Sequence, residues 1–370
     1  MKLGVVTTSY PRFAGDPAGN FVAGHVGALR ALGHDVEVIA AGMPEDTADG
    51  TADDTPAGDA VVRVGGARLF YRGGAPDALE RAPVRAGVSA VVFTARLTAQ
   101  VTWRARRWDA IIAHWLVPSA LAALPAPRPL VAIAHGGDVF TLRRMHLLRP
   151  VLWALRRRGA RLVFVSEHLR AIARDEAPAL ASWLDAAIVQ PMGLPLARFA
   201  ALERAPSDPP IVLVAARLVP IKGIDVAIAA MSHVRSGARL VIAGDGPERA
   251  RLTATPGAHT FLGEVTTEER DDLLRTASVV VVPSRIMPNG RTEGTPAIAI
   301  EALAAGVPVI ASSVGGLCDL PGVRLVPPED PYELARAIDQ VLAHPPSAES
   351  LRAGVTNLDW REVAPRLIRE

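Results

Sequence analysis

Short, uniformly apolar runs alternate with segments of helical periodicity along the first half of this chain. Such runs, bounded by turn residues, are typical of strands that are buried on both faces of a parallel sheet. The helical segments between them begin with one over about Phe21–Leu32, which Gly33 ends. Strands that alternate with helices predict βαβ units in a doubly wound parallel sheet. The apolar runs of this half are Leu3–Thr8, Val36–Ala40, Val61–Val64, Ala110–His114, Leu130–His135 and Leu162–Ser166.

A second pattern of the same kind starts after the short Pro-rich segment Arg204–Pro210. Two such patterns predict an α/β chain with two Rossmann-like, doubly wound parallel-sheet domains, over residues 1–203 and 204–345. The remainder, 346–370, is helical and can cross back to the N-terminal domain. The apolar runs of the second pattern are Ile211–Ala215, Arg239–Ala243, Val279–Val282, Val307–Ile310 and Arg324–Val326.

Length and composition narrow the class of protein. With 370 residues, of which 49% are hydrophobic, the chain can bury two cores. Its single cysteine, Cys318, excludes a disulfide framework and a cysteine-based metal site, and we expect it to be a small buried hydrophobe. The acidic stretch Met43–Ala60 has no periodicity and predicts a surface excursion without chemistry. Because the chain opens on a predicted strand and no apolar run is long enough to cross a bilayer, we expect a cytoplasmic protein.

Arginine is concentrated in Arg96–Arg174, which contains fourteen Arg against three acidic residues. Within it, the Arg-rich 140–161 region mixes Leu, Trp and Arg at helical spacing, and Pro150 interrupts the pattern. One interpretation is a helix that lies on anionic lipid, at the inner face of the plasma membrane. An ordinary amphipathic helix with solvated Arg side chains fits equally well. No aromatic ladder accompanies the Arg, which argues against nucleic acid as a partner.

The segment Thr292–Gly316 carries two carboxylates, Glu293 and Glu301, eight positions apart. Its pattern predicts a loop, a helix, a glycine stop and a strand. Pro296 suits the first helical turn, where its missing N–H costs nothing. Glu293 would then lie just before the helix and Glu301 about two turns further along it.

The start of this predicted helix would present free backbone amides, which form an anion site. They belong to Gly294, Thr295 and Ala297. A carboxylate beside them can accept hydrogen bonds from hydroxyls, and hydroxyls together with phosphate describe a sugar nucleotide. Alternatively, Glu293 only caps the helix and Glu301 is solvated.

The same stretch, with EGTP before the helix and EALAAGVPVI after, resembles the E-x7-E signature of the retaining GT-B glycosyltransferases of family 4. In that family the first Glu lies against the donor sugar and the second binds the ribose hydroxyls. The resemblance implies a GT-B fold, in which two Rossmann-like domains face each other across a cleft. It places the acceptor in the N-terminal domain and the nucleotide-sugar donor in the C-terminal domain. The donor-site residues that it implies here are Glu293, Gly294, Thr295, Pro296, Ala297 and Glu301.

Two cations, Arg217 and Lys222, follow the first predicted strand of the second domain. Ligands of open α/β sheets bind at such strand ends. Fixed cations there would stabilise the charge of a departing diphosphate, with Arg as a fork and Lys as a point charge. A pair of solvated surface cations is the alternative. The spacing resembles the R-x4-K diphosphate clamp of family 4, which implies catalytic roles for both residues.

Further loops resemble the family at strand ends. Gly244 and Gly246 lie in a GDGP turn that resembles the turn lining the donor site, and Val265 closes a loop that resembles the one beside the nucleotide base. Gly19 and Asn20 resemble the family's Gly-rich loop near the donor phosphate, although a plain turn is equally consistent. Because this loop lacks the G-x-G-x-x-G spacing, it argues against a dinucleotide enzyme.

The stretch HGGD, from His135 to Asp138, closes a predicted strand of the first domain. It resembles the family's HG-x-D, in which the His touches the transferred sugar, so that His135 is a candidate catalytic residue and Asp138 a candidate donor contact. A neutral imidazole can hydrogen-bond a hydroxyl, and a charged one can stabilise positive charge. His114 lies in the stretch HWLVPS, which also recurs in the family, and we interpret it as structural or as an acceptor-side residue.

Together these resemblances imply a retaining glycosyltransferase of hexosyl type that uses a UDP- or GDP-sugar and needs no metal or other cofactor. Its acceptor would be a glycan or glycolipid of bacterial cell-surface polysaccharide synthesis. No nucleophile is evident, which suggests a front-face route in which the leaving phosphate takes the acceptor's proton. The loop RIMPNGRT is longer than the family's shortest forms. Two alternatives remain, a nucleotide-sugar 2-epimerase of the same fold and a partner subunit that binds the nucleotide sugar without turnover.

Overall fold

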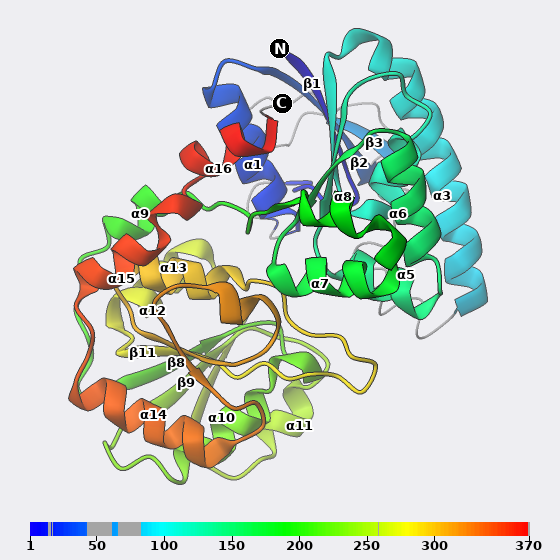
Figure 1. Cartoon of the computed structure of the whole chain (residues 1–370). Helices are drawn as coiled ribbons and strands as arrows, with labels where there is room; N and C mark the ends of the chain where they lie inside the picture. Colours follow the sequence, from blue (N-terminus) through cyan, green and yellow to red (C-terminus); the bar gives the residue numbers. More distant parts are fainter. Residues whose placement is uncertain (14–15, 17, 43–60, 66–82, 258, 369–370) are drawn as a thin grey trace. The chain divides into compact units, whose positions relative to one another are not determined.

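The computed structural model describes residues 1–13, 16, 18–42, 61–65, 83–257 and 259–368. Contacts divide the chain into two compact units: unit 1 comprises Met1–Gly193 and the segment from Trp360, and unit 2 comprises Leu194–Asp359. Each is an α/β domain on one parallel sheet (Figure 1), so the predicted pair of parallel-sheet domains is confirmed. The predicted excursion Met43–Ala60 lies outside the described residues.

In the described part of unit 1, the sheet has seven parallel strands in the order β3-β2-β1-β4-β5-β6-β7. The order changes direction between β1 and β4, and both faces of the sheet are covered, which is why the strand sequences are uniformly apolar. Six strands were predicted, while β7 is too short to leave a pattern. The strands are β1 (Lys2–Thr7), β2 (Asp35–Gly42), β3 (Val61–Gly65), β4 (Ala110–His114), β5 (Leu130–Ala134), β6 (Arg161–Phe164) and β7 (Ile188–Val189). The helices are α1 (Asn20–Ala31), α3 (Pro83–Arg104), α4 (Leu121–Ala123), α5 (Gly137–Arg144), α6 (Leu148–Arg157), α7 (Glu167–Glu176), α8 (Ala181–Asp185) and α16 (Trp360–Ile368).

Unit 2 repeats this topology with six parallel strands in the order β10-β9-β8-β11-β12-β13. Ile211 and Leu213 of β8 face one apolar cluster, and Val212 and Val214 face another, so both sheet faces are buried. The sequence did not predict β10, where exposed and partly buried residues alternate at the sheet edge. The strands are β8 (Ile211–Ala215), β9 (Arg239–Ala243), β10 (His259–Gly263), β11 (Val279–Val282), β12 (Val309–Ser312) and β13 (Val323–Val326). The helices are α9 (Leu196–Ala200), α10 (Ile224–Met231), α11 (Arg249–Thr253), α12 (Thr267–Thr276), α13 (Ala297–Ala305), α14 (Pro331–Ala343) and α15 (Ala348–Val355).

The boundary between the units lies at Leu194, ten residues before the predicted boundary at residue 204. The Leu194 N–H donates to the Leu358 carbonyl at 2.9 Å, and the Leu196 N–H donates to the Asp359 carboxylate at 3.1 Å. Leu196 and Phe199 of α9 join the core of unit 2. These contacts are long-range, so the Pro-rich composition after residue 204 was the wrong boundary signal.

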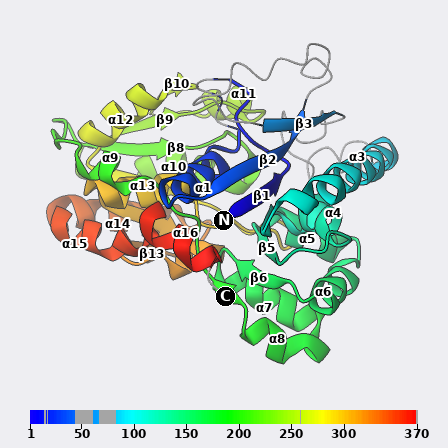
Figure 2. The same cartoon turned by 90° about the horizontal axis from the view of Figure 1, so that it is seen from above.

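The boundary between unit 2 and the C-terminal segment also lies later than the predicted residue 346, since unit 2 extends to Asp359. Helix α15 packs against α13, and Arg352 donates from Nε to the Ala304 carbonyl at 3.3 Å, so this helix belongs to unit 2. Only the segment from Trp360 joins unit 1, where α16 lies beside α1, as Figures 1 and 2 both show.

The Arg-rich 140–161 region forms two helices, α5 and α6, rather than one. The break falls at Met145–Leu147, and Pro150 lies in the first turn of α6, where a proline is tolerated. Leu148, Leu152 and Leu155 of α6 are buried in the core of unit 1. In the described part of the chain, no helix combines the length and apolar character that a membrane crossing requires.

Cys318 contradicts the expectation of a buried thiol, because its side chain is exposed. It lies in a loop after β12, between the buried Leu317 and Leu320, on the side of that turn that faces solvent.

Candidate functional site

Four loops of unit 2 lie at the carboxyl ends of β8, β9, β11 and β12, on either side of the point where the strand order reverses. Open α/β sheets bind ligands at such a point. Apart from Val265, all the predicted site residues of this unit lie in the first three of these loops or in α13, which follows the third. The topology therefore gathers residues that are more than eighty positions apart in sequence.

Lys222 and Glu293 are in direct contact at this point. Lys222 Nζ lies 2.8 Å from Glu293 Oε2, and the two side chains are 20% and 17% exposed. Ser284 Oγ donates to the same carboxylate oxygen at 3.4 Å. Lys222, Ser284 and Pro296 line a small pocket beside the pair. Partial burial strengthens the ion pair because water screens it less than at an open surface.

The backbone of the loop after β12 contacts the backbone of Glu293. The Gly316 N–H donates to the Glu293 carbonyl at 3.3 Å. Gly315 has a φ of +52°, and a Cβ at that residue would lie 2.0 Å from the same carbonyl oxygen. Only glycine therefore lets this loop approach Glu293 so closely.

We expect Gly315→Ala to displace Glu293 and to lower the free energy of unfolding by about 2 kcal/mol or more, because backbone strain adds to the steric clash. Gly237→Ala is the matched control, since Gly237 has a φ of +72° but no atom within 4 Å of the added Cβ. Chemical denaturation of both variants separates the two costs. Equal losses of stability in the two variants would show that the clash with the Glu293 carbonyl adds nothing to the cost of the backbone conformation.

The start of α13 leaves backbone amides without partners. Pro296, with a ψ of 130°, is the N-cap of α13 rather than part of its first turn, which corrects the prediction by one residue. Within the described residues, the N–H groups of Gly294, Thr295 and Ala297 form no hydrogen bond. Such amides at a helix N-terminus are suited to bind an anion.

Glu301 lies in the second turn of α13 and is buried, which excludes the alternative of a solvated carboxylate. Its Oε1 is 3.2 Å from Arg270 Nη1, and its side chain is 7% exposed. Burial raises the pKa of Glu301, and the charge of Arg270 opposes that rise. Arg270, on α12, also lies over the ring of Phe199 at 5.7 Å. Sequence reasoning missed Arg270, because a helical Arg in a charged segment carries no signal of this contact.

The loop that carries Arg217 rests on the GDGP turn after β9. The Leu218 N–H donates to the Asp245 carbonyl at 2.8 Å. Gly244 has a φ of +125°, and a Cβ there would lie 2.0 Å from the Ala216 carbonyl oxygen. Arg217 itself is exposed. The close backbone packing therefore requires glycine at position 244 whether or not a ligand binds there.

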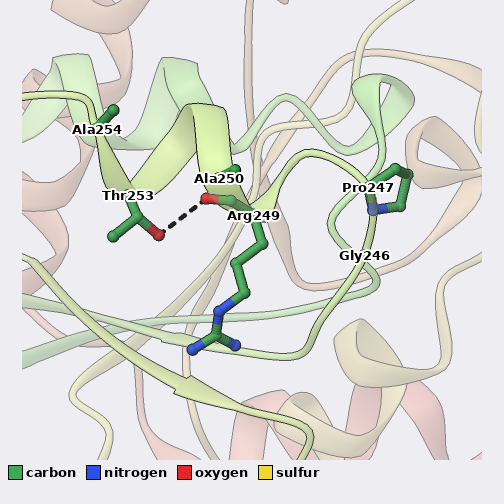
Figure 3. Close-up of a pocket in the computed structure, with 6 residues that line it drawn as sticks. All are labelled: Gly246, Pro247, Arg249, Ala250, Thr253 and Ala254. Atoms are coloured by element: carbon green, nitrogen blue, oxygen red, sulfur yellow. Dashed lines mark hydrogen bonds between the residues drawn. The ribbon is translucent and has the colours of Figure 1, made fainter.

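An open pocket adjoins this turn in unit 2. Figure 3 shows it with the Arg249 side chain extending from α11, and the Thr253 hydroxyl donating to the Arg249 carbonyl at 2.8 Å. Arg249 also pairs with Asp245 at 3.4 Å. The pocket is lined by Gly246, Pro247, Arg249, Ala250, Thr253 and Ala254. Val265 lies apart, after β10, where it packs against the core of the unit, and its contact with a base stays a prediction.

In unit 1, Gly19 and Asn20 lie where the loop after β1 enters α1. Gly19 is the N-cap of α1, and Asn20, its first residue, is exposed. Asp16 organises this loop, since its carboxylate accepts from the Arg12 Nε at 2.9 Å and from the Ala18 N–H at 3.0 Å. Asp16 thus ties Arg12 to Ala18, and the role of Gly19 and Asn20 toward a donor stays a prediction.

Asp138 is buried and organises the loop that carries His135. Its carboxylate accepts backbone N–H groups from Leu116 at 2.7 Å, Gly136 at 2.9 Å, Val139 at 2.9 Å and His135 at 3.2 Å. Burial raises the pKa of Asp138, and these hydrogen bonds oppose the rise. The carboxylate oxygens are thus occupied by backbone, so a contact of Asp138 with the donor stays a prediction.

His135 is partly exposed and is surrounded by aromatic rings. Its ring centroid lies 5.1 Å from that of Phe21 and 4.8 Å from that of Trp115. Burial lowers the pKa of His135 to about 3, so that the imidazole is neutral near pH 7. Trp115 has a φ of 71°, an uncommon conformation for a residue with a side chain, and such strain gathers at functional sites. Phe21 and Trp115 were missed, because single aromatic residues beside a strand are ordinarily core residues.

No cluster of three His, Cys, Asp or Glu side chains that could bind a metal ion occurs within the described ranges.

Comparison with known proteins adds a family context to this geometry. Residues 18–180 match the family model described as Glycosyltransferase Family 4, and residues 209–344 match the one described as Glycosyl transferases group 1. TuaC of Bacillus subtilis, a glycosyltransferase named for teichuronic acid biosynthesis, is 32% identical over 249 residues. That alignment covers 62% of this chain and 60% of TuaC, so the chain spans less than two thirds of this relative.

Two further similarities extend over nearly the whole chain. The glycogen synthase of Mycobacterium tuberculosis is 28% identical over 409 residues, which cover 98% of this chain and 92% of that enzyme. HepE of Anabaena, solved in complex with UDP and glucose, superposes with a TM-score of 0.67 at 19% identity, over 99% of this chain and 98% of HepE. The structural likeness shows the shared fold, two α/β domains of the GT-B type.

Proposed function

Because this chain belongs to the glycosyltransferases of the group 1 and family 4 type, we propose that it moves a hexose, with retention, from a nucleotide-diphosphate sugar to a glycan or glycolipid. The observation that carries the proposal is the ion pair of Lys222 and Glu293 beside the unpartnered amides of α13. A cation, a carboxylate and free amides in one place supply what phosphate and sugar hydroxyls require. We assign the donor to unit 2 and the acceptor to unit 1.

In the proposed reaction the bond between the anomeric carbon and the donor phosphate breaks, and the diphosphate departs with its bonding electrons. Lys222 and Arg217 stabilise the charge that develops on it, which favours the transition state over the bound donor. Glu293 accepts hydrogen bonds from the sugar hydroxyls, and the N–H groups of Gly294 and Thr295 donate to oxygens of the donor. Glu301 accepts from the ribose hydroxyls.

Retention follows from a front-face route in this proposal. The acceptor oxygen bonds to the anomeric carbon on the face that the phosphate leaves, and its proton passes to the departing phosphate oxygen. The contact of Glu293 with Lys222 at 2.8 Å supports a positioning role, because the cation holds the carboxylate in one orientation. The step consumes no metal, oxidant or second cofactor.

A UDP-sugar or a GDP-sugar is the proposed donor, and UDP bound to HepE supports the first. TuaC, named for teichuronic acid biosynthesis, supports an acceptor in cell-surface polysaccharide or glycoconjugate synthesis. The proposal is tested by incubating the full chain with UDP-, GDP- and ADP-sugars and following donor hydrolysis or transfer by product analysis. An epimerised sugar nucleotide would indicate the 2-epimerase instead, and saturable binding without turnover would indicate the non-catalytic subunit.

We further propose a cytoplasmic location with peripheral contact between the Arg-rich 140–161 region and anionic lipid. Met145, Leu147 and Trp153 are exposed there, and Arg157 lies over the Trp153 ring at 5.5 Å. Exposed apolar side chains among Arg residues are suited to a lipid surface.

Reversing two charges of α6, in Arg156→Glu with Arg157→Glu, is expected to abolish co-sedimentation with phosphatidylglycerol vesicles at moderate salt, because each cation near an anionic surface contributes about 1 kcal/mol. The matched control reverses Arg324 and Arg336 of unit 2, both exposed. Equal loss in both double variants would refute a specific contact of α6.

A further inference from the structure

Three histidines of unit 1 form a continuous hydrogen-bonded chain that ends at His135. His25 Nδ1 lies 3.1 Å from His114 Nε2, and His114 Nδ1 lies 3.0 Å from His135 Nε2. His25 and His114 are fully buried, whereas His135 is partly exposed. The three residues come from α1, the end of β4 and the loop after β5, so their spacing in the sequence does not predict that they are in contact.

Ring contacts fix the orientation of the two outer imidazoles. His25 stacks on Trp360 of α16, with ring centroids 5.0 Å apart and ring planes within 1°. At the other end, Phe21 and Trp115 flank His135. The chain of three rings is therefore a built feature of unit 1, supported by the C-terminal helix that joins this unit.

The three imidazoles are neutral, since burial is the largest cause that lowers the pKa of each one, to about 3 for His25 and His135. A neutral imidazole carries one N–H, so two N···N hydrogen bonds allow two consistent arrangements of the protons. In one, every N–H is on Nδ1 and points toward His135. In the other, every N–H is on Nε2 and points toward His25.

The environment of His25 selects between these arrangements. His25 Nε2 is buried and has no hydrogen-bond partner among the described residues. A buried N–H without an acceptor is rarer and more costly than an unpaired lone pair. The proton of His25 is therefore on Nδ1, and the same holds for His114 and His135. His135 then carries its proton on Nδ1, which bonds no described residue.

We propose that His25 and His114 are positioning residues that fix His135 as a neutral Nδ1–H donor toward a substrate hydroxyl. The substrate role rests on the proposed glycosyl transfer, while the tautomer stands on the geometry of unit 1 alone. Because its Nε2 accepts from His114, His135 donates a hydrogen bond and removes no proton. This agrees with a reaction in which the leaving phosphate takes the proton.

Nitrogen-15 NMR of the imidazoles in the full-length protein tests the tautomer directly. Loss of one imidazole signal set in His135→Gln, His114→Gln and His25→Gln variants assigns the three rings. We expect all three to be Nδ1–H tautomers, although the Nε2–H form predominates for free histidine in water. Nε2–H tautomers, or a charged His135 at pH 7, would overturn the proposal.

Kinetics then separate positioning from mere structural support. His114→Leu breaks the chain and is expected to lower kcat about five- to tenfold, the worth of one neutral hydrogen bond, with His135 changing tautomer. His114→Gln offers an amide donor and acceptor and is expected to restore most of kcat. Ser119→Ala is the matched control, since Ser119 is fully buried nearby and its hydroxyl has no partner among the described residues.

Equal losses in His114→Leu and His114→Gln, with an unchanged His135 tautomer, would assign His114 a structural role only and contradict the proposal. If no nucleotide sugar is turned over by the unmodified protein, the proposed function fails, but the NMR result still decides the tautomer. The two failures are therefore distinguishable.

Discussion

Lys222→Ala is expected to lower the turnover of the nucleotide sugar by about 10²- to 10³-fold, or about 3–4 kcal/mol of transition-state stabilisation. The nucleoside diphosphate moiety should lose much less affinity, because the charge that Lys222 meets develops as the bond to the sugar breaks. The chain has only two lysines, Lys2 and Lys222, among 40 basic residues. A compact ammonium at this site, where Arg is used nearly everywhere else, agrees with a point-charge role.

The measurement is single-turnover kinetics, with nucleoside diphosphate affinity measured by calorimetry on the same preparation. Lys2→Ala removes the other lysine, at the exposed start of β1, and serves as the matched control. Lys222→Gln keeps a hydrogen bond to Glu293 without the charge, so it isolates the electrostatic part of the effect. Unchanged turnover in Lys222→Ala would remove Lys222 from the mechanism.

The double change of Lys222 and Glu293 carries additional information. Because Nζ and Oε2 are 2.8 Å apart, the two single changes are expected to be non-additive. Each residue holds the other in the geometry that the donor requires. Additive losses would mean that the ion pair of the ligand-free protein is not kept when the donor binds.

The sequence predicted most of the sheets because buried parallel strands leave uniform apolar runs. Among the described residues, eleven of the thirteen strands follow from that signal, and those missed are β7, with two residues, and β10, at a sheet edge. The boundaries between the two units could not be predicted from local composition. Leu194–Leu202 joins unit 2 through contacts with Leu358, Asp359 and the core, and pairings of that range leave no trace in local composition.

The candidate site divides in the same way. Motif spacing and the crevice rule singled out Lys222 and Glu293, because strand-end loops at a reversal of strand order converge whatever their separation in sequence. The partner of Glu301, Arg270, could not be predicted, since an ion pair between two helices depends on their packing. The burial of Cys318 was predicted wrongly for the same reason, because the side of a turn that faces solvent is a tertiary property.

Glu301→Ala is expected to lower the affinity for nucleoside diphosphates by about 10²-fold or more, since hydrogen bonds to a charged group contribute about 1.5–3 kcal/mol each. The measurement is a thermodynamic cycle with UDP or GDP and the corresponding 2′,3′-dideoxy nucleotide. The dideoxy ligand lacks both hydroxyls and should bind the parent protein and the variant equally. A loss of affinity for both ligands would mean that Glu301 supports the fold of the site rather than the ribose.

Proton binding to Glu301 gives a second, independent signature. The pKa of Glu301 is raised above the ordinary value of 4.5, chiefly by burial. Protonation removes an acceptor, so nucleotide affinity should fall as the pH falls through this raised pKa, in a window that begins above pH 4.5. Glu301→Gln isolates the effect, because it binds the same ligand without this titration. The difference between its pH profile and that of the parent protein belongs to residue 301.

Stability must move in the opposite direction over that window. Since the folded state binds the Glu301 proton more tightly than the unfolded state, this contribution to the free energy of unfolding is present at low pH and is lost as the pH rises through the raised pKa. Binding and stability are thus expected to oppose each other across one titration, with both slopes reduced in Glu301→Gln. If nucleotide affinity and the free energy of unfolding changed in the same direction with pH in the parent protein, the proposed role of Glu301 as a buried, charged ligand of the ribose would be contradicted.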